Sequence, residues 1–162
     1  MRPGTGSAAR PVAPEPELLA AYLAARYEID TGAGLLRLEI GARPAVPPPA
    51  PGCVHAVLTA CNPGSVPLPV EENRARQARL QSELDALGLR WRPARNHAAD
   101  GSWAEPACWI ADIAPARLDD LAARFGQNAS LTVATDGVCR LRIHRDDWLP
   151  HDRDDDRLQW PN

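Results

Sequence analysis

The sequence predicts a fold of the α+β class, and two observations lead to this prediction. Along residues 53–134, segments with strand and helix periodicity follow in the order strand, helix, strand, strand, helix, strand. With 162 residues, the chain suits one domain that buries roughly 70% of its unfolded surface. The order is that of a ferredoxin-like split βαβ core, here with an extra strand at each end and an N-terminal helix.

The N-terminal part predicts a leader, a helix and a strand. Residues 1–14 are rich in Gly, Pro, Ala and Ser without periodicity, which is typical of a disordered leader. A single α+β domain is expected over residues 15–145. Its first element is predicted as a helix in "PELLAAYLAARYEI", residues 16–29, where apolar residues recur at helical spacing. Residues 34–41 alternate apolar and charged side chains, as a half-buried strand does.

A proline-rich connection leads to the predicted centre of the sheet. Residues 43–52 contain too many prolines for a helix or an inner strand. The following "CVHAVLTAC", residues 53–61, is apolar at nearly every position, which is typical of a strand with both faces buried. A helix is predicted over residues 69–87, between Pro69 and Gly88. Asn73 interrupts its apolar stripe.

The second half of the chain predicts a hairpin, a helix and another hairpin. "LRWRPAR", residues 89–95, is predicted as a strand at a sheet edge, because Pro93 cannot donate a backbone hydrogen bond. The elements expected after it are a loop (96–103), a returning strand (108–113), a helix (115–125) and two final strands (130–135 and 138–144).

The formal charge is concentrated at the C-terminus. The chain carries −3, and residues 146–162, which we expect to form an acidic tail, contain six Asp and two Arg, a balance of −4 that leaves +1 for the rest. A nearly neutral body lacks the basic surface that binds a nucleic-acid backbone, so nucleic acid is not an expected partner. No apolar run reaches the roughly 20 residues that span a bilayer, so we expect no membrane association and a cytoplasmic location.

The predicted topology gathers polar residues at one end of the sheet. That end holds the exit of the first core strand, the start of the first core helix, the tip of the middle hairpin and the entry of the last core strand. The candidate ligand-binding residues there are Thr59, Asn62, Glu72, Asn73, Trp103, Glu105 and Gln127. Each has an ordinary structural interpretation, for example Asn62 as a turn residue. Their convergence favours a functional one, because buried amides and carboxylates need partners.

Four motifs resemble a known family. "LTACNPGS", "EENRARQARLQSEL", "GSWAEPACWI" and "ARFGQNA" are similar to the pattern of the bacterial domain-of-unknown-function family 3293, over roughly residues 54–144. The matching positions are Thr59, Asn62, Pro63, Glu72, Asn73, Trp103, Glu105, Pro106, Gly126 and Gln127. Members often have an aromatic residue where this chain has Cys61. The family has no assigned activity, so the resemblance supports the choice of residues and implies no mechanism.

Three functions remain open on the sequence alone. Binding of a small polar molecule, such as a nucleotide base or an amino acid, is preferred, because the amides both donate and accept hydrogen bonds and Trp103 offers a stacking surface. The first alternative is a hydrolase- or transferase-type enzyme with Glu105 as a general acid or base in apolar surroundings. The second is an RNA or protein interaction module that uses the arginine-rich strands, with Arg90, Trp91, Arg92, Arg140 and Arg142.

Neither a cofactor, a metal site nor a reactive thiol is expected. Side chains of the type that binds metals gather near the C-terminus, where a solvated tail is the preferred interpretation: His144, Asp146, Asp147, His151 and Asp152. The four cysteines form no C-x-x-C pair and lie in apolar segments, as buried reduced thiols do. For Cys61, an activated thiolate before a helix is the less favoured interpretation.

Overall fold

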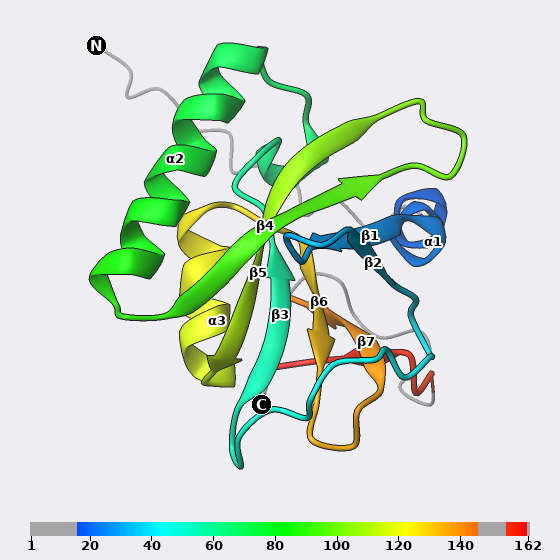
Figure 1. Cartoon of the computed structure of the whole chain (residues 1–162). Helices are drawn as coiled ribbons and strands as arrows, with labels where there is room; N and C mark the ends of the chain where they lie inside the picture. Colours follow the sequence, from blue (N-terminus) through cyan, green and yellow to red (C-terminus); the bar gives the residue numbers. More distant parts are fainter. Residues whose placement is uncertain (1–15, 146–154, 162) are drawn as a thin grey trace, which may run out of the picture.

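The strands of the chain form one curled sheet (Figure 1). The computed structural model describes residues 16–145 and 155–161. The described helices are α1 (Pro16–Ala24), α2 (Val70–Ala86) and α3 (Pro115–Arg124). The described strands are β1 (Arg26–Asp30), β2 (Leu35–Leu38), β3 (Val54–Leu58), β4 (Arg90–His97), β5 (Ala104–Ile113), β6 (Ala129–Val133), β7 (Cys139–Ile143) and β8 (Leu158–Gln159). Their order is β2-β1-β4-β5-β3-β6-β7-β8. The α+β class is confirmed.

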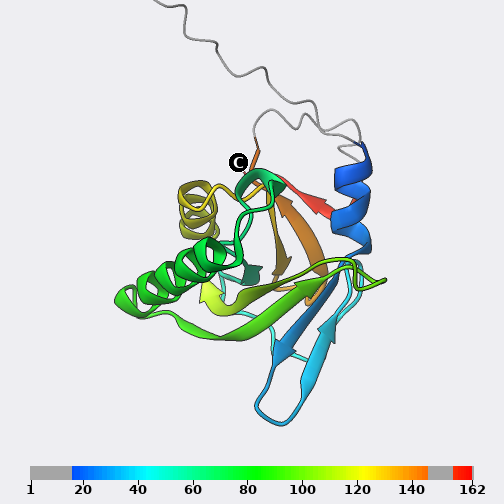
Figure 2. The ribbon, with the colours of Figure 1, turned by 90° about the horizontal axis from the view of Figure 1, so that it is seen from above.

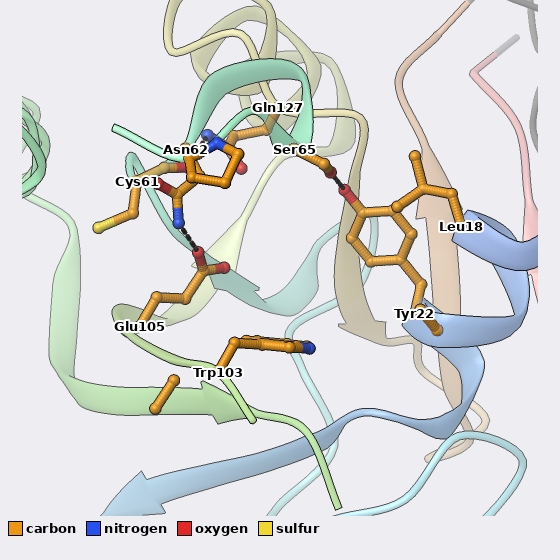
Figure 3. Close-up of a pocket in the computed structure, with 11 residues that line it drawn as sticks. Leu18, Tyr22, Cys61, Asn62, Ser65, Trp103, Glu105 and Gln127 are labelled. Atoms are coloured by element: carbon orange, nitrogen blue, oxygen red, sulfur yellow. Dashed lines mark hydrogen bonds between the residues drawn. The ribbon is translucent and has the colours of Figure 1, made fainter. Parts of the chain in front are cut away.

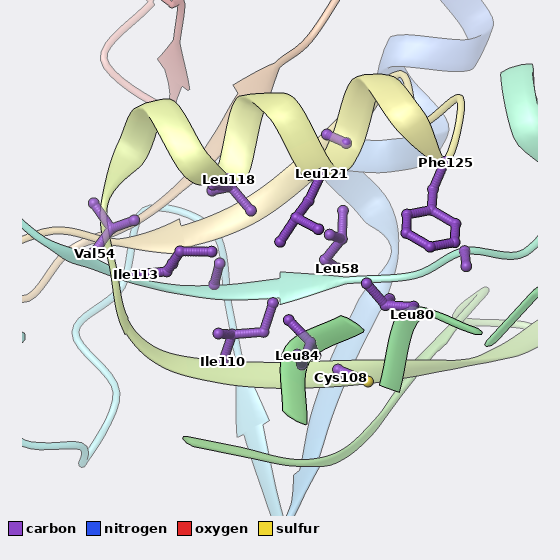
Figure 4. Close-up of a cluster of buried hydrophobic side chains, with 13 residues drawn as sticks. Val54, Leu58, Leu80, Leu84, Cys108, Ile110, Ile113, Leu118, Leu121 and Phe125 are labelled. Carbon is purple, nitrogen blue, oxygen red and sulfur yellow. The ribbon is translucent and has the colours of Figure 1, made fainter. Parts of the chain in front are cut away.

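The helices α2 and α3 cover one face of the sheet. Every residue of β3 is buried, so this strand is central, and Leu58 belongs to the cluster that packs against both helices. Leu80 and Leu84 of α2 and Leu118 and Leu121 of α3 are fully buried in that cluster (Figure 4). Their spacing along each helix is the one that places side chains on a single face. Burial of this apolar surface holds both helices on the sheet.

The opposite face of the sheet forms a second core, and α1 covers one end of it. Val57 of β3 packs there with Tyr27 and Trp109. Figure 2 shows α1 standing apart from α2 and α3, beside the strands. The Tyr27 hydroxyl donates a hydrogen bond of 2.8 Å to the Tyr22 carbonyl oxygen, which fastens the end of α1 to β1. Helix α1 therefore borders the end of the sheet at which the candidate site was predicted.

The four strands of the predicted core lie in the order β6-β3-β5-β4, and each neighbouring pair is antiparallel. The sheet continues further than predicted, with two strands beyond each side of the core. On the β6 side, the two outer strands β7 and β8 are parallel to each other, so the sheet as a whole is mixed. Residues 43–52 form neither helix nor strand.

The predicted helix over residues 16–29 is too long. Helix α1 ends at Ala24, and Arg26–Asp30 forms β1, which pairs with both β2 and β4. Tyr27 and Ile29 are buried while Glu28 between them is partly exposed, so this segment also has the two-residue period of a strand. Backbone pairing on two sides decides between the two periods.

The prediction that the strand with Pro93 lies at the edge of the sheet is wrong. Strand β4 lies between β1 and β5. However, β1 pairs with residues 94–97 of β4, so Pro93 lies just beyond the paired stretch. Its missing N–H therefore interrupts neither the ladder with β1 nor the fold.

Part of the predicted acidic tail belongs to the sheet. Leu158 and Gln159 form β8 beside β7, and Arg140 Nε donates a 3.0 Å hydrogen bond to the carbonyl oxygen of Asp156. Four of the residues considered as metal ligands lie outside the described residues: Asp146, Asp147, His151 and Asp152. The predicted leader, residues 1–14, also lies outside them. Within the described segments, no group of His, Cys, Asp and Glu could hold a metal ion. No described helix has the length and apolarity needed to cross a membrane.

Candidate functional site

The end of β3 is anchored before the chain turns into the site. Thr59 is buried, and its hydroxyl donates a 2.8 Å hydrogen bond to the Pro106 carbonyl while accepting one of 3.1 Å from the Cys61 N–H. Asn62 follows in the left-handed conformation, with φ 48° and ψ 59°. Asn is among the few residues that adopt this conformation at low cost. Thr59 therefore has a structural role in positioning Asn62.

Asn62 and Asn73 form a closed hydrogen-bonded pair. The Asn62 N–H donates to Asn73 Oδ1 at 2.9 Å, and Asn73 Nδ2 donates to Asn62 Oδ1 at 2.7 Å. Asn62 Oδ1 also accepts from the Leu68 N–H at 3.0 Å. The polar residue that interrupts the stripe of α2 is thus explained, because Asn73 holds the turn after β3 against the helix.

Glu105 is the titratable residue at the centre of this arrangement. It lies near the start of β5, directly opposite Asn96 of β4, and its Oε2 accepts a 3.1 Å hydrogen bond from Asn62 Nδ2. Burial raises the pKa of the Glu105 carboxyl from 4.5 to about 6, although the Asn62 and Asn96 amides act in the opposite direction. A carboxyl with this pKa changes charge near neutral pH.

Gln127 and Arg76 hold the turn from the other side. Gln127 Nε2 donates to the carbonyl oxygens of Cys61 at 2.9 Å and Phe125 at 3.2 Å. Arg76 reaches from α2 to the carbonyl of Ala60 at 2.8 Å and to that of Phe125 at 2.7 Å. The turn is consequently fixed to both α2 and the end of α3.

A cavity of about 260 Å³ opens beside Glu105 (Figure 3). Its walls come from α1, the turn after β3, the β4–β5 loop with the start of β5, and the segment after α3: Leu18, Ala21, Tyr22, Cys61, Asn62, Ser65, Pro67, Trp103, Ala104, Glu105 and Gln127. The hydroxyls of Tyr22 and Ser65 are hydrogen-bonded to each other, and Asn128 Nδ2 donates to both. Trp103 is 39% exposed and forms part of the cavity wall.

Two further cavities adjoin Glu105. One of about 460 Å³ lies toward α2 and shares Cys61, Asn62, Ala104 and Glu105 with the first. The other, of about 20 Å³, lies toward the second core, and Asn96 and Tyr27 are among its lining residues. The Oδ1 atom of Asn96 is buried and has no hydrogen-bond partner among the described residues. Glu105 is thus accessible from more than one side.

The structure brings most of the predicted site residues together, and it separates one. Asn62, Asn73, Glu105 and Gln127 are connected by the contacts described above, and Trp103 lines the same cavity as Glu105. Glu72 does not join them. It is exposed on the first turn of α2 and lines none of the three cavities, because the helix turns Asn73 toward the site and its neighbour away.

Sequence reasoning missed Tyr22, Ser65 and Asn96 as members of the site. Tyr22 has the spacing of the apolar stripe of α1, which gives no sign of a hydroxyl that faces a cavity. Asn96 could have been found, because an amide within a strand that is buried needs hydrogen-bond partners. Ser65 follows the turn motif and looks like any turn serine.

The burial of Cys61 favours an unreactive thiol at this position. Cys61 is buried, and burial is the main reason that the pKa of its thiol is raised above 9.0. A raised pKa keeps the thiol protonated and unreactive at neutral pH. All four cysteines are free.

The fold and site together define a small α+β protein with a cavity that contains one carboxyl at one end of a curled sheet. Residues 58–130 match the model of a family described as "Protein of unknown function (DUF3293)", and this part of the chain belongs to that family. Comparison with curated proteins and with solved structures gave no match. The matched residues include Asn62, Asn73, Glu105 and Gln127, whereas α1 and its Tyr22 lie outside them.

Proposed function

We propose that the cavity beside Glu105 binds a small polar molecule. The observation that carries this proposal is a carboxyl with a raised pKa, held at the wall of a cavity next to a half-exposed tryptophan. Ligand sites typically combine apolar walls with a few fixed polar groups, and their volumes begin at about 300 Å³. The cavity of about 260 Å³ therefore suits a ligand of one ring or a single amino acid.

The fixed position of Glu105 supports binding further. The Asn62–Asn73 pair orients one carboxylate oxygen, and the turn that carries Asn62 is attached to two helices. A polar group held in place before binding loses little conformational entropy when the ligand arrives. Such preorganisation is costly to build around a buried carboxyl, which favours a functional reason for it.

The experiment that tests the proposal is a thermal-shift screen of nucleobases, nucleosides and amino acids against the wild type and variants. A true ligand raises the Tm of the wild type and of Glu72→Gln, which removes an exposed carboxylate on α2. The same ligand gives a clearly smaller shift with Glu105→Gln. If no compound shifts the wild type, or if Glu105→Gln responds as the wild type does, the proposal fails.

Replacing Trp103 with Ala is expected to weaken ligand binding with little loss of stability. The side chain is 39% exposed, so truncation leaves a small cavity penalty, below about 1 kcal/mol. Loss of a stacking surface costs about 1–3 kcal/mol for a flat ligand, or roughly ten- to a hundredfold in Kd. Urea unfolding measures the first quantity and calorimetric titration of a screen hit the second. A variant that binds as tightly as the wild type would show that Trp103 is not part of the site.

Replacing Glu105 with Gln is expected to remove a pH dependence of the stability. Because the folded pKa of about 6 exceeds the ordinary 4.5, the folded state holds the proton more tightly than the unfolded state. The contribution of Glu105 to the free energy of unfolding, about 2 kcal/mol in all, is then fully present below pH 4.5 and is lost as the pH rises through 6. Across this range, the difference in unfolding free energy between the wild type and Glu105→Gln should change by this amount in urea unfolding, whereas the difference between the wild type and Glu72→Gln should stay constant. Parallel curves for all three proteins would contradict the raised pKa.

The raised pKa also favours a second candidate function, general acid catalysis by Glu105. A carboxyl with a pKa of about 6 can donate a proton near neutral pH far better than an ordinary one. Turnover of a screen hit that Glu105→Gln abolishes, while binding persists, would assign this function. The reaction class follows from the hit and is not specified by the geometry.

The other finer inferences concern fold and partners. We infer that β3, α2, β4, β5, α3 and β6 form a ferredoxin-like unit, which the antiparallel order β6-β3-β5-β4 supports. Three arginines of the alternative RNA-binding face pair with carboxylates at 2.7 Å, namely Arg90 with Asp112, Arg140 with Asp136 and Arg142 with Asp119. Arg92 donates instead to the Thr31 carbonyl oxygen at 3.4 Å. These ion pairs support the expectation that nucleic acid is not the partner. Four free cysteines support a cytoplasmic location.

A further inference from the structure

The charge of the cavity beside Glu105 restricts which molecules it can accept, and this inference rests on the function proposed above. Among the described residues that line the cavity, Glu105 is the one side chain with a formal charge, and none is Arg or His. An anionic ligand would face an uncompensated carboxylate in a partly buried space. A ligand with a positive charge would compensate it.

The walls of the cavity suit a cation that is also flat. Figure 3 shows the rings of Trp103 and Tyr22 approaching the space next to the Glu105 carboxyl from different sides. Aromatic faces attract cations, and tryptophan does so most strongly. A planar cation can stack on the indole and keep its edge directed at a carboxylate, which a tetrahedral ammonium group cannot do.

The hydrogen-bonding capacity at Glu105 calls for a ligand that donates. Oε2 is taken by Asn62 Nδ2, and Figure 3 shows the other carboxylate oxygen directed away from Asn62, toward the side of Trp103 and Tyr22. The Asn62 amide is itself engaged with Glu105, Asn73 and the Leu68 N–H, and so cannot turn to serve a ligand. Oε1 of Glu105 is therefore a carboxylate acceptor directed toward the cavity, beside the Asn96 amide that also hydrogen-bonds this carboxyl.

We infer that this cavity binds a small planar organic cation with N–H donors, of the amidinium or guanidinium class, stacked on Trp103 and donating to Glu105. The carboxylate form of Glu105 is the binding form. Affinity for such a cation should accordingly rise with pH as Glu105 loses its proton near pH 6.

The other titratable groups around Glu105 do not produce the same pH dependence. Tyr22 of α1, Tyr27 of β1 and Cys61 of the turn interact with Glu105, and burial raises the pKa of each, so all three stay neutral at pH 5–8. Arg74 lines the neighbouring cavity toward α2 and is paired with Glu71 at 2.8 Å. His97 lies on β4 opposite Ala104, next to Glu105, so a transition near pH 6 in binding is assigned to Glu105 where Glu105→Gln removes it.

The test uses two pairs of compounds that share shape and differ in charge: benzamidinium with benzamide, and methylguanidinium with methylurea. Calorimetric titration of the full chain at about pH 7.5 should give cations that bind at least roughly tenfold more tightly than their neutral partners. In Glu105→Gln the two members of a pair should bind within about twofold of each other. Glu72→Gln, which loses the same charge outside the cavity, should keep the preference. At about pH 5 the preference of the wild type should shrink toward that of Glu105→Gln.

The outcomes separate the inference from the function on which it rests. If benzamide or a neutral screen hit binds as well as benzamidinium, and binding depends on Trp103, the cavity is a ligand site and the cation inference is wrong. If a cation is preferred to the same extent in Glu105→Gln, the charge of Glu105 is not the cause and the inference is also wrong. If none of the four probes and no compound of the screen binds, both fail.

Discussion

Replacing Asn62 with Ala is expected to lower the free energy of unfolding by about 2–4 kcal/mol. The side chain accepts from the Leu68 N–H and Asn73 and donates to Glu105, so its loss leaves three partly buried groups without this partner, each costing about 1 kcal/mol or more before relaxation. Alanine also pays about 1 kcal/mol to adopt the left-handed backbone at φ 48°. The turn that carries the site would lose its attachment to α2.

The variant Asn62→Gly separates the two causes of that loss. Glycine adopts the left-handed conformation freely, so it removes the hydrogen bonds and spares the backbone cost. Urea unfolding should rank the stabilities as wild type above Asn62→Gly, with Asn62→Ala lowest by about a further 1 kcal/mol. If the free energies of unfolding of both variants lie within about 0.5 kcal/mol of the wild-type value, Asn62 is an ordinary turn residue and its hydrogen bonds with Asn73 do not stabilise the fold.

Replacing Gly126 with Ala is expected to be far more destabilising than the same change at Gly88. Both glycines follow a helix in nearly the same conformation, with φ +68° at Gly126 and +67° at Gly88. A methyl group at Gly126 would lie 2.8 Å from the Cβ of Pro63, whereas at Gly88 it would meet nothing within 4 Å. The backbone cost of about 1 kcal/mol is common to both, and overpacking adds about 1–3 kcal/mol at Gly126 alone.

The comparison of Gly126→Ala with Gly88→Ala also tests how the site is held. Pro63 follows Asn62 directly, and the Gly64 N–H donates a 2.8 Å hydrogen bond to the Gly126 carbonyl. A displaced Pro63 should therefore move Asn62 and reduce ligand-induced thermal shifts, while Gly88→Ala leaves them unchanged. Equal stability of the two variants, measured by urea unfolding, would mean that the turn and the end of α3 are not in close contact.

The fold could be predicted from the sequence where one period of side chains is clear. The continuous apolar run around Val57 and the leucine stripe of α2 each have a single interpretation, and the structure has a central strand and a buried helix face there. The segment around Tyr27 fits both a helix and a strand, and its state is decided by strands that pair with it from distant parts of the chain. The same holds for β8, whose two residues have no strand signal of their own.

The site could be predicted where a polar residue interrupts a pattern. Asn73 breaks the stripe of α2, and the predicted topology was enough to place it near Asn62 and Glu105. Neighbouring residues on a helix point in different directions, so Glu72 beside it is exposed and lies apart from these residues. Tyr22 could not be found, because its place at the cavity depends on how α1 docks onto the sheet, which local sequence does not determine.

Titration of the Glu105 side chain by carbon-13 NMR tests the proposed site most directly. The chemical shift of the Glu105 carboxyl carbon follows the protonation of this one side chain, so its midpoint gives the pKa of Glu105. We expect a midpoint near pH 6 in the free protein, and a midpoint at lower pH in the presence of saturating benzamidinium, because a bound cation favours the carboxylate. A midpoint close to 4.5 that benzamidinium does not change would show an ordinary solvated carboxyl and would contradict a ligand site at Glu105.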